Sequence, residues 1–160
     1  MNFAPIQPSY DAPMAAIVRA ALEEHGLNIP GTAYYDPSLD HLSAYYDAPG
    51  RAYYVLEEKG AVIGGVGLAK FHGLPGCCEL QKLYLTSAYR GRGLGREMIR
   101  FIEDRAREMG YRQIYLETHS ALGAALRAYE GAGYRRIPRP DAVIHTTMDR
   151  FYLKELQHSF

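Results

Sequence analysis

Apolar residues recur every three to four positions in three stretches of the chain, which is the spacing of an amphipathic helix. The first predicted helix has Ser9 or Asp11 as its cap and stops before Gly26, and the second stops at Gly110. The third is rich in alanine and ends at Gly131. A further short helix is expected near residue 40. The predicted helices therefore run from Ser9 or Asp11 to about residue 25, and over residues 38–46, 94–109 and 121–130.

Short apolar runs bounded by turn residues indicate strands. Two of them flank residues 58–60 and predict a hairpin, whereas the first, bounded by Pro5 and Pro8, is expected at a sheet edge. A strand, a helix and another strand follow the hairpin, so parallel and antiparallel pairs should coexist. We expect an α/β fold of the α+β type, with a mixed, mostly antiparallel, twisted sheet flanked by helices. The expected strands are residues 3–7, 51–57, 61–70, 77–86, 113–117, 134–137 and 145–153.

The chain has 160 residues, enough for one domain and too few for a barrel of eight βα units. Its fractions of hydrophobic residues, 48%, and charged residues, 22%, are those of an ordinary globular protein. No apolar run approaches the roughly 20 residues that span a bilayer, and no secretory signal is recognisable. The neighbours Cys77 and Cys78 rarely bridge to each other and cannot hold a metal alone. We expect a single cytoplasmic domain, residues 1–160, without a metal or a membrane segment.

The 18 basic and 18 acidic residues cancel, but they are unevenly distributed. Residues 1–81 hold four basic and nine acidic side chains, residues 82–112 eight and four, and residues 113–160 six and five. The net charges of these segments are −5, +4 and +1, so the middle segment is suited to bind an anion and the first half to bind a cation. Arg100, Arg105 and Arg107 are best interpreted as the solvated face of a helix. A neutral total argues against a nucleic-acid binder that works by bulk positive charge.

A glycine-rich loop at residues 89–96, between a predicted strand and a long helix, carries the main chemical signal. Its alternating glycines let the backbone approach a ligand, and the free N–H groups that open the helix attract an anion. Arg90, Arg92 and Arg96 add positive charge where a helix N-terminus alone disfavours it, which indicates a phosphate or pyrophosphate. The loop matches neither a Walker motif nor the dinucleotide-binding fingerprint. A plain glycine turn with surface arginines is the alternative interpretation.

Four segments resemble, in order, those of the GCN5-related N-acetyltransferases (GNAT). Residues 90–95 match the family's Arg/Gln-x-x-Gly-x-Gly/Ala signature, and residues 79–85 resemble the strand before it. Residues 115–118 resemble the next strand, and residues 129–134 resemble the family's Tyr-Glu-x-x-Gly-Phe segment. The four segments in this order and spacing are specific. The resemblance implies a single-domain GNAT fold of six to seven strands and about four helices, with acetyl-CoA-dependent N-acetyltransferase activity.

The resemblance also implies where acetyl-CoA binds. The loop amides would hold its pyrophosphate, and the preceding strand would bulge and splay so that its backbone binds the pantetheine arm and polarises the thioester carbonyl. Independently, Leu80 and Leu83 cannot share a face of an unbroken strand, which fits a bulge or a strand buried on both faces. Ala121 replaces a frequent asparagine, and Ser120 is placed to cap the helix or replace that contact. The implied cofactor-binding residues are Leu83, Tyr84, Leu85, Arg90, Gly91, Arg92, Gly93, Leu94, Gly95, Arg96 and Ser120.

Two residues are implied to catalyse the transfer. Tyr129 matches the tyrosine that protonates the leaving thiolate, although its helical spacing is also typical of a core aromatic. Glu79 is the expected base for the acceptor ammonium, with Glu117 on the adjacent strand as the second candidate. For either residue, an exposed or salt-bridged carboxylate is as good an interpretation as a catalytic base. His119 and His145 are weaker candidates, more typical of solvent-facing or hydrogen-bonding residues.

The acceptor is expected to be a primary amine on a small molecule or peptide. Tyrosine doublets at 34–35, 45–46 and 53–54 interleave with Asp36, Asp40 and Asp47, a combination that can hold a cation. An equally good interpretation is that one tyrosine of each doublet packs in the core while the other faces water. Residues 145–149 are a further candidate to face the acceptor.

We expect direct attack of the amine on the thioester. A covalent route through the adjacent cysteines is disfavoured, because buried cysteines are usually inert. The alternatives are a GNAT-fold module that binds acyl-CoA without transfer, and a transferase that uses another acyl-CoA. Nucleic-acid and membrane partners are not expected, and a sheet edge near the C-terminus can pair in a homodimer.

Overall fold

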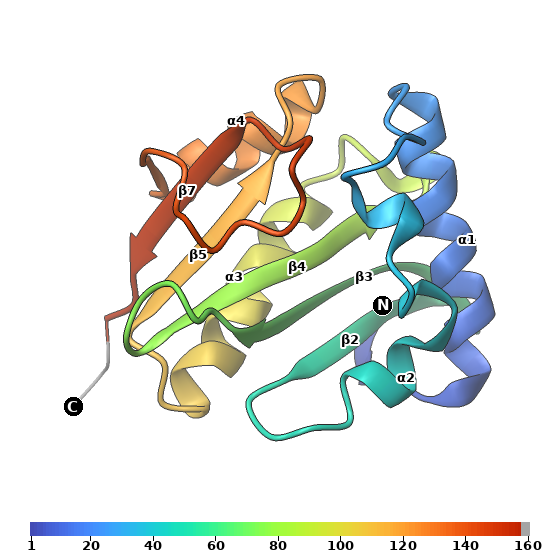
Figure 1. Ribbon diagram of the computed structural model, residues 1–160. Helices are drawn as coiled ribbons and strands as arrows, with labels where there is room; N and C mark the ends of the chain where they lie inside the picture. Colours follow the sequence, from blue (N-terminus) through green and yellow to red (C-terminus); the bar gives the residue numbers. More distant parts are fainter. Residues whose placement is uncertain (158–160) are drawn as a thin grey trace.

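The computed structural model describes residues 1–157, which form one twisted sheet of seven strands with helices on both faces (Figure 1). The strand order is β1-β2-β3-β4-β5-β7-β6, with β4 and β5 parallel and the other neighbours antiparallel. This mixed, mostly antiparallel sheet confirms the expected fold class. The strands are β1 (Asn2–Pro5), β2 (Ala52–Glu58), β3 (Ala61–Lys70), β4 (Cys77–Leu85), β5 (Gln113–Thr118), β6 (Arg135–Arg136) and β7 (Arg150–Glu155).

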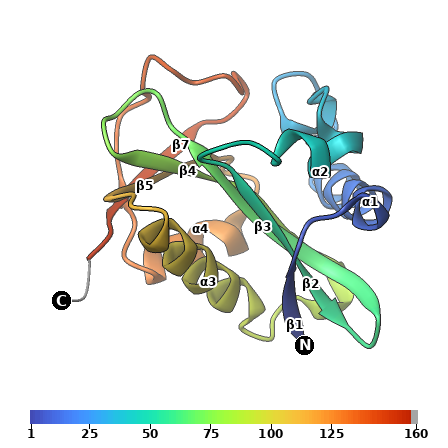
Figure 2. The ribbon, with the colours of Figure 1, turned by 90° about the horizontal axis from the view of Figure 1, so that it is seen from below.

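Two helices lie on each side of the sheet (Figure 2). One face carries α3 (Leu94–Glu108) and α4 (Gly123–Gly131), and the other carries α1 (Pro8–Glu24) and α2 (Leu42–Tyr45). Within residues 1–157, no helix combines the length and the apolar character needed to cross a bilayer. The 3-10 turns η1 (Ala33–Tyr35) and η2 (Leu39–His41) connect α1 to α2, and η3 (Ser87–Tyr89) precedes α3.

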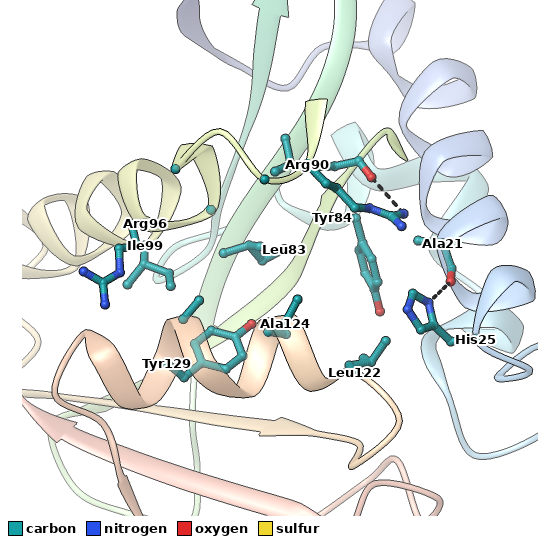
Figure 3. Close-up of a pocket in the computed structure, with 16 residues that line it drawn as sticks. Ala21, His25, Leu83, Tyr84, Arg90, Arg96, Ile99, Leu122, Ala124 and Tyr129 are labelled. Carbon is teal, nitrogen blue, oxygen red and sulfur yellow. Dashed lines mark hydrogen bonds between the residues drawn. The ribbon is translucent and has the colours of Figure 1, made fainter. Parts of the chain in front are cut away.

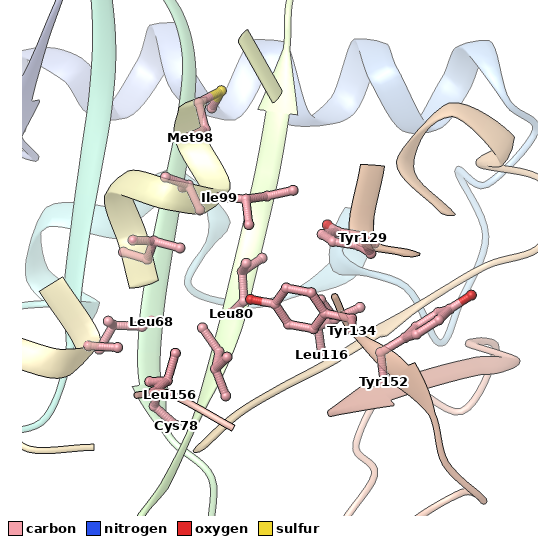
Figure 4. Packing of buried hydrophobic residues seen from close by; sticks show 14 of the residues in the cluster. Leu68, Cys78, Leu80, Met98, Ile99, Leu116, Tyr129, Tyr134, Tyr152 and Leu156 are labelled. Carbon is pink, nitrogen blue, oxygen red and sulfur yellow. The ribbon is translucent and has the colours of Figure 1, made fainter. Parts of the chain in front are cut away.

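The face under α3 and α4 carries the larger apolar core (Figure 4). Met98, Ile99 and Ile102 of α3 are almost inaccessible to solvent and belong to one cluster with Leu68 and Leu80 of the sheet. These α3 residues recur every three to four positions, so they form the apolar stripe that holds the helix against the sheet.

The opposite face has two separate apolar cores. Under α1, Met14 and Val18 pack with Tyr53 of β2. Over β5 and β7, Phe71 stacks on Tyr115 with the ring centroids 4.0 Å apart. Polar side chains of β4 and β5 lie between these two cores and contribute to the site described below.

β4 carries a bulge near its C-terminal end. At the bulge a single residue of β3, Val66, stands opposite two residues of β4, Lys82 and Leu83. Lys82 has a φ of +49°, which few residues with a side chain adopt. The extra residue brings Leu80 and Leu83 to the same side, where both contact the core under α3. The structure thus selects the bulge over a strand that is regular and buried on both faces.

β4 also parts from β5. The two strands pair only at three positions, Cys77–Glu79 opposite Gln113–Tyr115. Beyond Glu79 the β4 residues remain paired with β3 alone. The splayed strand expected from the family resemblance is therefore present.

Two predicted element boundaries at the C-terminal half were wrong. The last strand was expected over residues 145–153, but β7 begins at Arg150, because Met148 N donates to His145 O at 3.1 Å and closes a turn. Helix α4 begins at Gly123 and not at residue 121, and Ser120 does not cap it. The hydroxyl of Ser120 instead donates to Asp149 Oδ2 at 2.9 Å.

Two helix predictions in the N-terminal half also needed correction. Neither Ser9 nor Asp11 caps α1, because the helix already begins at Pro8 after an extended Gln7. The Asp11 carboxylate instead accepts hydrogen bonds from the N–H and hydroxyl of Ser43, at 2.8 and 2.6 Å, and so holds α2 against α1. The helix expected over residues 38–46 is divided between η2 and α2.

A buried carboxylate ties α3 to the last strands. Glu103, which is 3% exposed, accepts hydrogen bonds from Lys154 Nζ at 3.0 and 3.1 Å and from the Tyr134 hydroxyl at 2.9 Å. Lys154 lies on β7, and Tyr134 directly precedes β6. A buried charge is costly unless it is paired, so these contacts depend on one another.

We expect Glu103→Ala to lower the free energy of unfolding by about 3 kcal/mol, because it leaves the buried Tyr134 hydroxyl and the half-buried Lys154 ammonium without their partner. Urea denaturation followed by circular dichroism measures the change. Glu108→Ala, which removes a surface ion pair with Arg105, is the control and should cost less than about 0.5 kcal/mol. Equal losses in the two variants would contradict the role assigned to Glu103.

Candidate active site

The glycine-rich loop joins η3 to α3 in a conformation that requires glycine. Gly91 and Gly93 have φ of +76° and +78°, and a Cβ at either position would meet nothing within 4 Å. The backbone angle, and not a lack of space, therefore selects glycine at both positions. Gly93 is the N-cap of the 15-residue helix α3, whose first N–H groups have no partner inside the helix. The loop is thus suited to bind an anion.

Two of the three loop arginines reach the space beside the loop. Arg90 and Arg96 line a pocket there, whereas Arg92 lies over the ring of Tyr89, 4.9 Å from its centroid. An ion pair with Glu24 of α1 holds the Arg90 guanidinium. The Arg96 guanidinium lies so close to Gly131 of α4 that a Cβ there would be 1.9 Å from Nη2.

The pocket has a volume of about 550 Å³ and lies between the loop, the end of β4, α4 and α1 (Figure 3). Leu83, Tyr84 and Leu85 of β4 form one wall. The helices contribute mainly small side chains, which leave room between α4 and β4. These residues are Ala124, Ala125 and Ala128 of α4 and Ala21 of α1.

Tyr129 lies at the inner end of this pocket. Its side chain is almost fully buried, with the ring 5.9 Å from that of Tyr134 and 6.4 Å from that of Tyr152. Its hydroxyl points into the pocket (Figure 3), and no residue in the described part of the chain forms a hydrogen bond with it. Burial raises the pKa of Tyr129, so the hydroxyl is protonated at neutral pH. The ring therefore belongs to the core, and the hydroxyl can donate to a ligand.

Glu79 lies where β4 and β5 part, and its side chain is on the other face of the sheet from Leu80. It accepts a hydrogen bond from Gln81 Nε2 at 2.9 Å. Burial, together with the neighbouring charge of Glu117, raises the pKa of Glu79 to about 7. A carboxylate with this pKa is suited to accept a proton near neutral pH.

Four charged residues lie beside Glu79 on this face. Lys82 Nζ donates to Asp36 Oδ2 at 2.7 Å, and the ring of His145 lies between Asp36 and Glu117, at 2.8 and 3.2 Å. Burial opposes the charge of Asp36, but His145 and Lys82 hold the pKa of its carboxyl below the usual value. These contacts join η1, β4, β5 and the segment before β7 into one polar cluster, which we call the acceptor-side cluster: Asp36, Glu79, Lys82, Glu117 and His145.

Most of the cofactor-binding residues predicted from the sequence surround the pocket. Leu94 instead enters the core and is 4% exposed. Arg92 and Ser120 are not among the residues that line the pocket. The predicted residues that line it are Leu83, Tyr84, Leu85, Arg90, Gly91, Gly93, Gly95, Arg96 and Tyr129.

The structure also separates residues that the sequence grouped together. Of the three aspartates expected near a cationic acceptor, only Asp36 reaches the acceptor-side cluster, whereas Asp40 pairs with Arg19 at the surface. Tyr46 and Tyr53 are buried and Tyr35 is exposed, which favours core packing over a cation site for most of the doublets.

Sequence reasoning missed the α1 wall of the pocket and the central place of His145. Ala21 and His25 line the pocket, but the sequence indicated only an apolar helix position for Ala21 and the end of that helix for His25. The polar residues before β7 were the only sequence feature that pointed to a role for His145. Its contact with Asp36 could not be predicted from the sequence, because the two residues lie 109 positions apart.

The adjacent cysteines do not take part in either region. Cys77 and Cys78 are buried in apolar cores on opposite faces of the sheet. Burial raises the pKa of Cys77 to about 12 and raises that of Cys78 as well, so both thiols stay protonated.

Comparisons with known proteins identify the family that this chain resembles in sequence. The model of the acetyltransferase (GNAT) family matches residues 16–134, which include the loop, β4, β5 and Tyr129. The uncharacterized N-acetyltransferase YjgM of Escherichia coli K12 is 40% identical over 126 residues, or 78% of this chain and 75% of that protein.

Solved structures show the same fold. A GNAT-family acetyltransferase from Staphylococcus aureus Mu50 has a TM-score of 0.85 at 21% identity, covering 98% of this chain and 99% of that one. A phosphinothricin acetyltransferase of the GNAT superfamily from Sinorhizobium meliloti, in complex with acetyl-CoA, has a TM-score of 0.75 at 20% identity. That match covers 97% of this chain and 88% of the other.

Proposed function

The chain belongs to the acetyltransferase (GNAT) family, and we propose that it transfers the acetyl group of acetyl-CoA to a primary amine on a small molecule or peptide. One observation carries the proposal: an anion-binding loop, an apolar pocket and a gap between two strands follow one another. The loop suits the pyrophosphate of acetyl-CoA, the apolar pocket suits its pantetheine arm, and the gap between the strands gives the thioester access to an acceptor.

In this proposal the amides at residues 91–95 bind the pyrophosphate at the N-terminus of α3, with Arg90 and Arg96 beside it. The pantetheine arm follows Leu83–Leu85, whose backbone faces no β5 partner, in the manner of an added strand. The fit is supported by the small side chains of α4, which leave the necessary space. The neighbour that binds acetyl-CoA supports the choice of cosubstrate.

The transfer needs a neutral amine and a protonated leaving group. Glu79 takes a proton from the acceptor ammonium, either directly or through a water molecule, and the amine nitrogen then attacks the thioester carbonyl carbon. A backbone N–H of the bulged strand stabilises the oxyanion. The C–S bond breaks as the tetrahedral intermediate collapses, and the Tyr129 hydroxyl gives its proton to the departing thiolate. The attacking nitrogen releases its second proton to water, which returns a proton to the Tyr129 oxygen, so that the products are a neutral amide and free CoA. The inert cysteines support this direct route over one through an acyl-enzyme.

A panel of primary amines, assayed for release of free CoA from acetyl-CoA, tests the proposed function. At least one amine should give turnover well above the hydrolysis of acetyl-CoA without acceptor. Tight binding of acetyl-CoA without turnover of any amine would instead indicate a binding module. Faster transfer from succinyl-CoA or propionyl-CoA would correct the acyl group.

We expect Gly93→Ala to weaken acetyl-CoA binding by about tenfold, because alanine disfavours the left-handed angle by roughly 1–2 kcal/mol and the loop amides shift. Isothermal titration calorimetry measures the affinity. Gly60→Ala is the matched control, since Gly60 has a φ of +79°, no atom within 4 Å of an added Cβ, and a place in the β2–β3 turn. Gly60→Ala should lower the free energy of unfolding by a similar amount without loss of affinity for acetyl-CoA. Equal affinity in both variants would contradict a pyrophosphate site in the loop.

The pH dependence of kcat/KM for the amine should show an acid limb with a midpoint near 7, because the raised pKa of Glu79, about 7, leaves the base protonated below that pH. Glu79→Gln should abolish this limb and lower kcat/KM by roughly 100-fold at pH 7.5. Glu58→Gln, at the end of β2, is the control and should keep the wild-type profile. An unchanged profile in Glu79→Gln would assign the base elsewhere.

Tyr129→Phe should lower kcat by about 10-fold to 100-fold, because the thiolate loses its proton donor, while the affinity for acetyl-CoA changes little. Steady-state kinetics and calorimetry separate the two quantities. Tyr134→Phe removes a neighbouring hydroxyl that is bound to Glu103, and it should reduce stability without the same loss of kcat. An undiminished rate in Tyr129→Phe would remove this hydroxyl from the mechanism.

A further inference from the structure

Two segments far apart in sequence meet on the acceptor side of the sheet (Figure 1). The segment between β6 and β7 contacts the segment after α1 at two points. His145 Nε2 lies 2.8 Å from Asp36 Oδ1, and the Thr147 hydroxyl and N–H donate to the carbonyls of Pro30 and Gly31, at 2.7 and 3.2 Å. A Cβ at Gly31 would lie 2.3 Å from Thr147 Oγ1, so the approach requires glycine there.

The two nitrogens of the His145 ring face only acceptors. Nε2 contacts Asp36 and Nδ1 contacts Glu117, and a carboxylate that is ionised can only accept a hydrogen bond. Both ring nitrogens therefore donate, which requires the imidazolium. Burial alone would lower the pKa of His145, but the hydrogen bonds that the ring donates to Asp36 and Glu117 outweigh this effect and raise that pKa to about 9. Lys82 and Tyr115 complete the surroundings by bonding the remaining oxygens of the two carboxylates.

The charges of this bridge act on Glu79. Glu117 on β5 raises the pKa of Glu79, whereas His145 and Lys82 lower it, as does the hydrogen bond from Gln81. His145 therefore opposes the effect of Glu117, its own hydrogen-bond partner. Loss of the imidazolium would leave two carboxylates with less compensation in a buried place.

We propose that His145 is a positioning residue for the transfer: its imidazolium fastens the β6–β7 segment over the acceptor side of β4 and balances the charge of Glu117 beside Glu79. The role rests on the proposed function, in which Glu79 accepts the proton of the acceptor ammonium. His145 acts through Glu117 and Glu79 and does not itself exchange a proton with the acceptor.

Two variants should move the titration of Glu79 in opposite directions. His145→Gln keeps an amide that can form hydrogen bonds but removes the charge, so the midpoint of Glu79 should rise by roughly one pH unit. Glu117→Gln removes the repulsion, so the midpoint should fall. Carbon-13 NMR of labelled glutamate carboxyls follows the titration, and Glu79→Gln identifies the resonance. A residue that serves only to hold a loop would not produce opposite shifts.

The same variants test the fastening of the segment and its kinetic effect. His145→Gln should speed hydrogen exchange at the Thr147 amide and lower kcat/KM for the amine about fivefold at pH 7, the loss of ionised Glu79 that one pH unit implies. Affinity for acetyl-CoA, measured by calorimetry, should not change. His72→Gln, an exposed histidine in the β3–β4 turn, is the control and should leave all three readouts at their wild-type values.

Opposite shifts of the Glu79 midpoint, with faster exchange in His145→Gln, support the role of His145. An unchanged midpoint in both variants, or shifts in the same direction, overturns it. If His145→Gln does not fold, Glu117→Gln still decides, because it must lower the midpoints of both Glu79 and His145. Failure of the wild-type protein to bind acetyl-CoA or to acetylate any amine overturns the proposed function, and the NMR titrations judge His145 independently of that result.

Discussion

β4 and β5 are hydrogen-bonded through only three residue pairs, and the features assigned to the site surround the place where this pairing stops. The bulge opposite Val66 brings Lys82 to one face of the sheet and Leu83 to the other. The pocket with Tyr129 therefore lies on one side of the gap, and Glu79 with its charged neighbours lies on the other. A regular β4 that stayed paired with β5 would leave no opening through which a thioester could meet an amine.

The neutral total charge of the chain conceals two regions of different character. The N-terminus of α3 provides unpaired N–H groups and arginines for an anion, whereas in the acceptor-side cluster two of the three carboxylates, Asp36 and Glu117, contact the cations Lys82 and His145. The second region is more closely balanced than the acidic first half of the sequence indicates, because Lys82 and His145 come from elsewhere in the chain. Glu79, which has no cation as a direct partner, is the carboxylate left with a raised pKa.

Much of the fold could be predicted from local pattern. The apolar stripe of α3, the hairpin of β2 and β3, and the loop glycines all reflect constraints within a few residues of one another. The bulge was only one of two interpretations that the spacing of Leu80 and Leu83 left open, the other being a strand buried on both faces. The boundaries predicted at residues 145 and 121 were wrong, since the chain turns at Met148 and Asp149 binds Ser120. The contact between Asp149 and Ser120 joins segments 29 positions apart, and no local periodicity encodes it.

In the proposed reaction, the acetyl group passes from cofactor to acceptor through the gap between β4 and β5. A crystal structure of the chain with coenzyme A tests it most directly. We expect pyrophosphate oxygens within hydrogen-bond distance of the amides at residues 91–95, and the sulfur between the Leu83 backbone and the Tyr129 hydroxyl. A cofactor bound elsewhere, or a sulfur remote from both groups, would contradict it.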